Sequence, residues 1–510
     1  MNIWIITIGN SDVQLWTKDH WTNLYRTVRS QLGGRGFTPT EGTDDRFLVP
    51  GRVMGTVYGQ SQAQDYWDDL AFPLLDNFVG LVQHENIKID QIILILTDQE
   101  VVFSPSQRRS TQSAYWQDTC TLEPIVATYL KDKLPQAQLK SLLLQPQSPT
   151  EGLDDWDSVL KLIQSELAQL DFPDSATIYV SHQASTPAIS SAVQFETLLR
   201  FGHRVQFLVT SERDKELTKI LNRSTYLRGI RQQEAKTLLE RYDYSGVKAL
   251  LAPYLKPDVE ILLDAAIQWN SAKFDDFAKR LLDYPDNQLR QAVQERTKED
   301  NWWWTAYEAA YLGVVRLEQG NTVEALFHSF RAVEGLIAAW AKFKYPQYVK
   351  EEKDKYGKKA LFVKREIQEK MPEYRKKDFL KQPKIKLYSQ SLYDLLQEDK
   401  KTWKQNGDIK VFFKDARDER NKLFHKVLGL KRDEVYQAWG IRTPETNPTE
   451  LDLQKADKSW QDRVLGCLNF VSGKTFKFLD KPESDGTVAS LMAKVYQKLR
   501  DEISGSAFKP

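Results

Sequence analysis

A short stretch near the C-terminus carries residues whose types and spacing suit phosphodiester chemistry. It reads Arg417-Asp418-Glu419-Arg420-Asn421-Lys422-Leu423-Phe424-His425 and contains the only histidine after His328. A histidine can transfer protons near neutral pH, and an arginine can hold a phosphate in its planar fork. Together these groups could cleave a phosphodiester without a metal ion. The alternative is an exposed charged helix with an incidental histidine, because Arg-x4-His is a short and common pattern.

The helical spacing of this motif indicates a site completed by a second copy of the chain. Five residues along a helix leave Arg420 and His425 roughly 140° apart, whereas Arg417 is about 80° from His425. Asn421 and His425, four residues apart, lie on one face. One helix therefore cannot easily clamp a phosphate between its own arginine and histidine, but two helices that meet at a two-fold axis can.

Length and composition indicate a globular protein with two to four domains. The chain has 510 residues, of which 41% are hydrophobic and 28% charged, and its net charge is +1. Any contact with nucleic acid must therefore be local. Two cysteines, Cys120 and Cys467, exclude a disulfide framework and fit a reducing cytoplasm. Neither a signal peptide nor a membrane-spanning run is found, so we expect a cytoplasmic protein without a membrane partner.

Buried strands alternate with helical patterns over residues 1–210, and this order predicts a parallel sheet covered on both faces. Continuous apolar runs mark five strands, at 2–8, 91–97, 139–144, 176–181 and 203–210. Helices are expected between them, near 62–85, 119–133, 154–170 and 187–200. Residues 11–60 contain many glycines, and we expect loops with short strands there.

Polar loops follow three of these strands, where parallel sheets bind ligands. The loop before the last helix has hydroxyls, free N–H groups and a proline near the first helical turn, which suit an anion. An ordinary N-cap on a structural helix is the alternative. We favour a ligand site because two such loops lie at strand ends. The candidate ligand residues are Gly9, Asn10, Ser11, Asp12, Thr97, Asp98, Gln183, Ser185, Thr186 and Pro187.

Other patterns limit the kind of site. No Gly-x-Gly-x-x-Gly follows the first strand, so the sheet is not expected to bind a dinucleotide. His182 lies beside the candidate loop, but a loop histidine is more often structural. The histidines and cysteines lack metal-ligand spacing, so we expect no catalytic metal.

Beyond residue 210 the sequence reads as helical. Residues 234–251 predict a helical hairpin. Further helices are expected at 303–318, 322–343, 387–398, 409–427, 455–479 and 487–502. Residues 342–386 hold 16 Lys/Arg against 7 Asp/Glu, interleaved with aromatic residues. This basic stretch suits single-stranded RNA, through phosphate contacts and base stacking, as well as it suits a solvated charged face.

Three stretches together resemble one known family. Arg420-Asn421-x3-His425 matches the R-N-x3-H form of the HEPN ribonuclease motif, and residues 306–336 resemble the first HEPN helices. Residues 7–12 and 183–188 resemble the ligand loops of CARF (CRISPR-associated Rossmann fold) domains, with Ala184 and Ser185 in place of the usual glycines. Over most of its length the chain resembles the CARF–HEPN ribonucleases of type III CRISPR systems, the Csm6/Csx1-like family.

The resemblance implies an α/β plus all-α protein with three domains. They are a Rossmann-like CARF domain with a parallel sheet at 1–210, a helical connecting domain at 211–300 and a helical HEPN domain at 301–510. It also implies a homodimer or higher oligomer, activated by a cyclic oligoadenylate. Tetra-adenylate (cA4) is the first choice and hexa-adenylate (cA6) the second.

The implied activity is metal-independent cleavage of single-stranded RNA in antiviral defence, with no other cofactor. His425 would be the general base or acid, Arg420 would stabilise charge on the phosphate and Asn421 would orient one of them. Arg417 is a secondary candidate. Some family members also cut their activator in the CARF cleft, where Ser11 and Thr186 could position a 2′-OH.

Two other classes of protein stay open. One is a non-catalytic, nucleotide-sensing regulator that binds nucleic acid. The other is a small-molecule nucleotide enzyme whose active site is the sheet.

Overall fold

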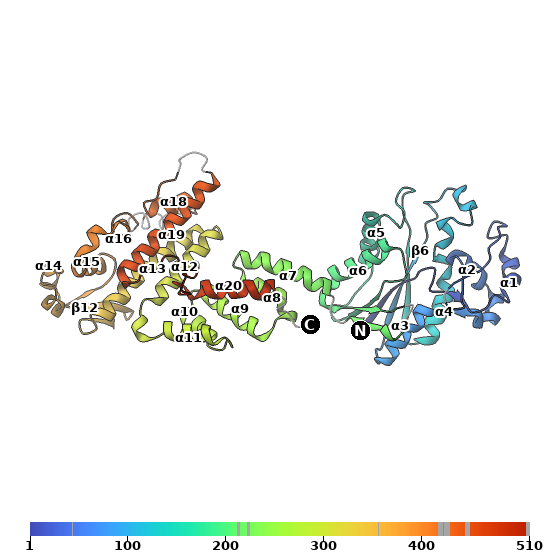
Figure 1. Ribbon diagram of the computed structural model, residues 1–510, viewed down its shortest axis with the longest axis horizontal. Helices are drawn as coiled ribbons and strands as arrows, with labels where there is room; N and C mark the ends of the chain where they lie inside the picture. Colours follow the sequence, from blue (N-terminus) through green and yellow to red (C-terminus); the bar gives the residue numbers. More distant parts are fainter. Residues whose placement is uncertain are drawn as a thin grey trace. The chain divides into compact units, whose positions relative to one another are not determined.

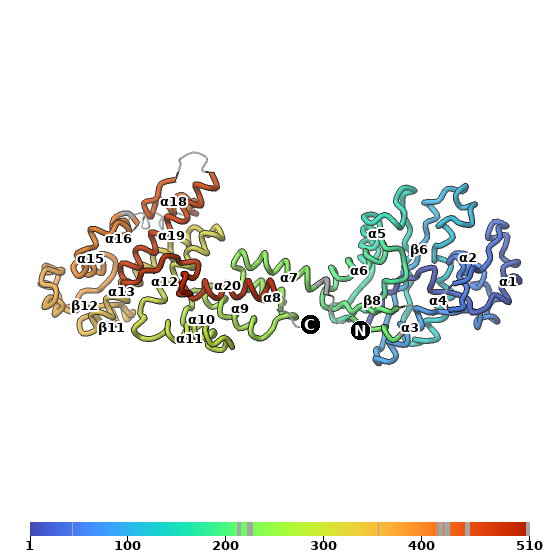
Figure 2. The backbone as a smooth tube through the Cα atoms, in the orientation of Figure 1, coloured from blue at the N-terminus to red at the C-terminus, as the bar shows by residue number. Residues whose placement is uncertain are grey.

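The chain divides into two compact units, Met1–Gly229 and Ile230–Pro510 (Figure 1, Figure 2). The computed structural model describes residues 1–42, 44–211, 215–221, 225–354, 356–416, 422, 429–443 and 449–505. Arg417, Arg420, Asn421 and His425 lie outside the described residues, so the roles assigned to them stay predictions.

The N-terminal unit is built around a six-stranded sheet in the order β10-β9-β8-β1-β6-β7. Five strands are parallel, and β10 joins antiparallel at the edge beside β9. All five strands predicted from apolar runs are confirmed, and β10 was not predicted. The strands are β1 (Asn2–Thr7), β6 (Gln91–Thr97), β7 (Gln138–Leu144), β8 (Thr177–Ser181), β9 (Val205–Val209) and β10 (Lys219–Leu221).

Helices cover both faces of this sheet because alternate side chains of each strand point to opposite faces. On β1, Trp4 and Ile6 pack in one hydrophobic cluster with residues of α1–α4, whereas Ile3 and Ile5 pack in another with residues of α5 and α6. These helices are α1 (Trp21–Val28), α2 (Gly51–Tyr58), α3 (Pro73–His84), α4 (Glu123–Lys133), α5 (Trp156–Ala168) and α6 (Pro187–Phe201). The strand order reverses between β1 and β8, and such a reversal opens a crevice at the carboxyl ends of the two strands.

The predictions for residues 11–85 need two corrections. The single helix expected at 62–85 is wrong: a 3-10 helix (Ser61–Asp69) and strand β5 (Leu70–Ala71) precede α3, which starts at Pro73. Proline suits a first helical turn because its missing N–H needs no partner there. The glycine-containing stretch expected to form loops contains α1 and α2, and a small antiparallel sheet, β3-β4-β2-β5. Its other strands are β2 (Gln14–Leu15), β3 (Thr40–Glu41) and β4 (Phe47–Leu48).

The C-terminal unit is mainly helical, and its buried side chains from Ala235 to Ile503 form one hydrophobic cluster. This cluster runs through the boundary expected at residue 300, and the three-domain division stays a prediction. The hairpin predicted at 234–251 is confirmed by α7 (Thr225–Glu240) and α8 (Tyr244–Leu251). The other α-helices among the described residues of this unit are α9 (Pro257–Asn270), α10 (Phe274–Leu281), α11 (Asn287–Arg296), α12 (Trp304–Glu318), α13 (Thr322–Lys344), α14 (Lys376–Phe379), α15 (Ser389–Asp399), α16 (Gly407–Val411), α18 (Arg432–Ala438), α19 (Glu450–Ser472) and α20 (Leu491–Ser504).

The basic stretch contains an antiparallel sheet that the sequence analysis did not predict. Strands β11 (Val349–Lys353), β12 (Lys359–Lys364) and β13 (Lys384–Lys386) form it in that order. Most of its side chains are at least partly exposed, so the apolar alternation that marks a half-buried strand is weak. Cross-strand ion pairs link Lys384 to Glu352 and Lys386 to Asp354.

Candidate functional site

A cavity of about 540 Å³ lies at the carboxyl ends of β1, β6 and β8, where the strand order predicts a ligand crevice. Seven of the ten candidate ligand residues line this cleft, namely Gly9, Asn10, Ser11, Thr97, Gln183, Ser185 and Thr186. Asp12, Asp98 and Pro187 are not among its lining residues. The fold therefore brings together loops that lie more than 80 residues apart in the sequence.

The loops after β1 and β8 meet through their backbones. A Cβ atom on Gly9 would lie 2.9 Å from the carbonyl carbon and oxygen of Ala184. Asp12 closes the first loop from inside, because its buried carboxylate accepts a 2.7 Å hydrogen bond from the Gly9 N–H. Asp12 thus shapes the loop instead of lining the cleft.

Asn10, which lines this cleft, contains a polar atom without a partner in the described part of the chain. Its side-chain Oδ1 is buried and has no hydrogen-bond partner among the described residues. A buried acceptor without a partner is costly, so such an atom in a ligand cleft marks a position where a ligand could donate a hydrogen bond.

Two candidate residues have structural partners. The Gln183 amide donates to the Thr210 carbonyl at 3.0 Å and accepts from the Thr210 N–H at 2.8 Å. Thr186 is the N-cap of α6: its Oγ1 accepts from the Ile189 N–H and donates to the Leu153 carbonyl at 2.8 Å. The N-cap alternative is therefore correct for the Thr186 hydroxyl, although the residue also lines the cleft.

His182 and Ser185 differ in how firmly their side chains are held. The His182 Nδ1 lies 2.8 Å from the Ser190 hydroxyl, and burial lowers the pKa of His182. His182 is not among the lining residues of the cleft, in agreement with the structural role expected for it. The Ser185 hydroxyl has only long contacts, of 3.4 and 3.5 Å, to the carbonyls of Thr186 and His182.

A buried charge network supports the cleft from the β6 side, and Asp98 is its only member among the ligand residues predicted from the sequence. The Arg52 guanidinium donates to Asp98 at 2.6 Å and to Asp118 at 2.8 Å. Asp118 also accepts from the Gln99 N–H at 2.8 Å. Asp98 is thus a partner of Arg52, and Asp118, Gln99 and Thr119 line the cleft in its place. No local spacing links Arg52 to Asp118, because 66 residues separate them.

This network determines the charge state of Asp98. Burial alone would raise its pKa, but hydrogen bonds from Arg52 and Gln145 outweigh burial and hold the pKa below its usual range. Asp98 is therefore a carboxylate at neutral pH. Arg52 thus places its positive charge against the Asp98 carboxylate in this wall.

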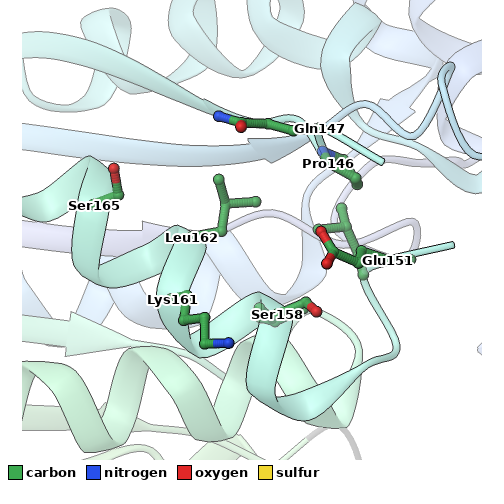
Figure 3. Close-up of a pocket in the computed structure, with 10 residues that line it drawn as sticks. Pro146, Gln147, Glu151, Ser158, Lys161, Leu162 and Ser165 are labelled. Carbon is green, nitrogen blue, oxygen red and sulfur yellow. The ribbon is translucent and has the colours of Figure 1, made fainter. Parts of the chain in front are cut away.

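A smaller cavity of about 190 Å³ lies next to the cleft and shares Leu153 with it. Figure 3 shows Ser158, Lys161 and Leu162 on α5 opposite Pro146 and Glu151 of the segment after β7. None of the candidate ligand residues lines this cavity.

In the C-terminal unit, both described flanks of the ribonuclease-like motif contact α13. Phe412 lies just before the motif, and the centroid of its ring is 5.0 Å from the centroid of the Phe330 ring. After the motif, the Leu430 carbonyl accepts a 2.6 Å hydrogen bond from the Thr322 hydroxyl. Among the described residues no group of three or more His, Cys, Asp or Glu is placed to hold a metal ion.

A Rossmann-like unit with a cleft at its strand-order reversal, followed by a helical unit, is the architecture expected for a CARF–HEPN protein. No protein-family model and no curated protein sequence matches the chain. Among solved structures, the chain is similar to Enterococcus italicus Csm6 bound to cyclic hexa-2′-fluoro-hexa-dAMP, with a TM-score of 0.55 and 13% sequence identity. The match covers 98% of this chain and 99% of that Csm6 chain. The predicted fold class and the structural resemblance to the CARF–HEPN family are confirmed. None of the described helices combines the length and apolar composition needed to cross a bilayer.

Proposed function

We propose that the chain is an endoribonuclease that cleaves single-stranded RNA when a cyclic oligoadenylate binds its N-terminal cleft, in type III CRISPR defence. The observation that supports this most strongly is the Csm6 fold over 98% of the chain, which includes the 540 Å³ cleft at the strand-order reversal. That Csm6 is bound to a cyclic hexanucleotide analogue. Both cA4 and cA6 are candidate activators of this chain.

Activation is proposed to act through a homodimer. A two-fold axis through paired N-terminal units makes one symmetric site for a symmetric ring. Ligand binding then shifts the population towards dimers whose two motif helices share a productive cleft. The helical spacing of Arg420 and His425, which separates them on one helix, supports such a shared cleft.

The proposed chemistry is attack of a ribose 2′-OH on its own 3′-phosphate. His425 accepts the 2′-OH proton or donates a proton to the leaving 5′-oxygen. Arg420 stabilises the charge that develops on the phosphate, and Asn421 orients His425 or the phosphate. Arg417 is proposed as a further residue that contacts the phosphate. The P–O5′ bond breaks, so the products are a 2′,3′-cyclic phosphate and a 5′-OH end, and chelators have no effect on the rate.

The test is cleavage of a labelled single-stranded RNA without ligand, with cA4 and with cA6. The proposal expects cleavage only with a ring of the correct size, and loss of cleavage in Arg420→Ala and His425→Ala. His84→Ala is the matched control, since His84 is 83% exposed in the other unit. Full activity of His425→Ala, or no cleavage with either cA4 or cA6, would contradict the proposed ribonuclease function.

We also propose a second activity, cleavage of the cyclic oligoadenylate in the N-terminal cleft, because side-chain hydroxyls line this cleft. Ser11 is favoured over Thr186, because the Thr186 hydroxyl already caps α6 and bonds Leu153. Incubation of the His425→Ala protein with labelled cyclic oligoadenylate tests whether the N-terminal cleft cleaves it. Linear products that disappear in Ser11→Ala support the activity, and an intact ring after long incubation rejects it.

A further inference from the structure

The C-terminal unit contains a pocket of about 350 Å³ between α13 and the start of α15, called here the α13–α15 pocket. These two helices lie side by side (Figure 1, Figure 2). The residues that matter for its chemistry are Phe327, Arg331, Glu334, Gly335, Tyr388 and Leu392.

The walls of this pocket combine exposed aromatic rings with hydrogen-bonding charges. Phe327 is 44% exposed and Tyr388 is 65% exposed, so both rings present surface that a ligand could contact. The Arg331 guanidinium lies over the Phe327 ring, 5.9 Å from its centroid. Aromatic rings and guanidinium planes stack on nucleobases. The Glu334 carboxylate, which accepts a 3.0 Å hydrogen bond from the Tyr393 hydroxyl, adds a negative charge to the pocket wall.

A glycine on α13 keeps one side of the pocket open. Gly335 lies in the middle of the 23-residue helix α13, where glycine is less favourable than alanine. A Cβ atom on Gly335 would meet no other atom of the described residues within 4 Å. Packing among the described residues therefore does not require this glycine. Close approach of a flat ligand would explain why position 335 is glycine, because glycine allows a ligand to contact the backbone.

The pocket wall continues directly from the basic sheet. Strand β13 ends at Lys386, and Leu387 and Tyr388, the next two residues, line the pocket. The surrounding stretch 342–386 has 16 Lys/Arg against 7 Asp/Glu. A phosphate backbone would be attracted to this surface.

The pocket also shares its helix with both flanks of the ribonuclease-like motif. Thr322 and Phe330 of α13 contact the residues just after and just before the motif, and Phe327 lies between them in the sequence. Phe330 itself lines the pocket. A nucleotide in the pocket is thus held on the same helix that anchors the ends of the motif.

We infer that the α13–α15 pocket binds a nucleobase of the single-stranded RNA substrate and sets the base preference of cleavage. This inference rests on the proposed ribonuclease function. The base stacks on the aromatic rings above Gly335, while the phosphates follow the basic surface of β11–β13.

The test measures binding of fluorescein-labelled oligo(A), oligo(U) and oligo(C) RNAs to the full-length His425→Ala protein by fluorescence anisotropy. Gly335→Leu fills the pocket, and Phe327→Ala and Tyr388→Ala remove its rings. Gly80→Leu is the control for the first variant, because Gly80 is an exposed, mid-helix glycine of α3 whose Cβ would also meet nothing within 4 Å. Val323→Ala is the control for the others, since Val323 is 40% exposed on α13 and outside the pocket lining.

Gly335→Leu and Gly80→Leu should both raise the melting temperature, because leucine favours a helix more than glycine does. Only the pocket variants should weaken binding, by about tenfold for the preferred base and less for the others. Unchanged affinity and base preference in all three pocket variants would overturn the inference while leaving the ribonuclease proposal intact. Failure of the parent protein to bind any RNA when cA4 or cA6 is present would remove both. A change of oligomeric state in the pocket variants, measured by light scattering, would instead identify the pocket as an interface between copies and reject nucleobase binding.

Discussion

Gly9 and Ala184 touch through backbone atoms, and a Cβ on Gly9 would approach the Ala184 carbonyl group to 2.9 Å. This contact joins the loops after β1 and β8 at the reversal of strand order. The methyl group of Ala184 is buried in the hydrophobic cluster of the sheet. The requirement for glycine therefore falls on Gly9, and an alanine is accommodated on the other side of the contact.

Gly9→Ala should force the two ligand loops apart. Overpacking of this kind costs about 1–3 kcal/mol of unfolding free energy. Binding of the cyclic activator should weaken as well, because Gly9 lines the cleft. Thermal denaturation and calorimetric titration with cA4 and cA6 measure the two effects. Gly36→Ala should change neither, since a Cβ there meets nothing within 4 Å; equal behaviour of the two variants would contradict the close approach.

Asn10→Ala should separate binding from stability. Its buried Oδ1 has no partner among the described residues, so its removal leaves no donor unsatisfied and should change the unfolding free energy by less than about 0.5 kcal/mol. If a ligand donates to this atom, affinity for the ring should fall roughly tenfold. Gln183→Leu provides the opposite case, because it leaves both Thr210 backbone groups without their partner and should destabilise the protein. An unchanged affinity for Asn10→Ala would exclude the Oδ1 as a ligand contact.

Arg52→Met should destabilise the N-terminal unit strongly. It leaves the carboxylates of Asp98 and Asp118 without their shared cation, and loss of one partner from a buried ion pair costs about 3–5 kcal/mol. Lys133→Met, which breaks an exposed pair with Asp132, should cost no more than about 1 kcal/mol. Urea unfolding at pH 7 measures the difference, and similar losses in the two variants would disagree with a buried network.

The same network predicts a dependence of stability on pH. The pKa of Asp98 is lower in the folded protein than its ordinary value, since hydrogen bonds from Arg52 and Gln145 outweigh burial. Its contribution to stability is therefore complete above the unfolded pKa of about 4 and is lost as the pH falls below that value towards the folded pKa. Wild-type protein should lose more unfolding free energy than Arg52→Met between pH 6 and pH 3. Parallel losses in urea titrations would show that Arg52 does not lower this pKa.

Mixing two inactive proteins tests the shared ribonuclease cleft. Arg420→Ala and His425→Ala should each lose at least about 100-fold in cleavage rate. After exchange of subunits, mixed dimers carry one arginine and one histidine in a common cleft and should recover part of the activity. No recovery in a mixture shown by mass spectrometry to contain mixed dimers would argue against a site shared by two copies.

The sequence was sufficient to predict the five parallel strands of the sheet and the position of the cleft at their carboxyl ends. Strands buried on both faces are long apolar runs, and β1 and β6 have this pattern without interruption. The order of elements implies a parallel sheet, and the loops at its carboxyl ends contain seven cleft residues. The predictions from sequence were wrong where tertiary packing overrides the local preference of residues for helix or loop. Gly51 and Gly55 argue against a helix, yet α2 forms. The packing explains the glycine at position 55, because a Cβ atom there would lie 2.2 Å from the Thr121 carbonyl oxygen.

By itself the sequence determined the fold class, the loops that line the cleft and the motif that is proposed to cut RNA, because each is encoded in adjacent residues. Only the tertiary structure showed that Arg52 joins Asp98 to Asp118, that Gly9 touches Ala184 and that Gly335 leaves a pocket open beside Tyr388. These relationships join residues that are distant in the chain. They follow from how the strands and helices pack, and no local pattern of residue types specifies them.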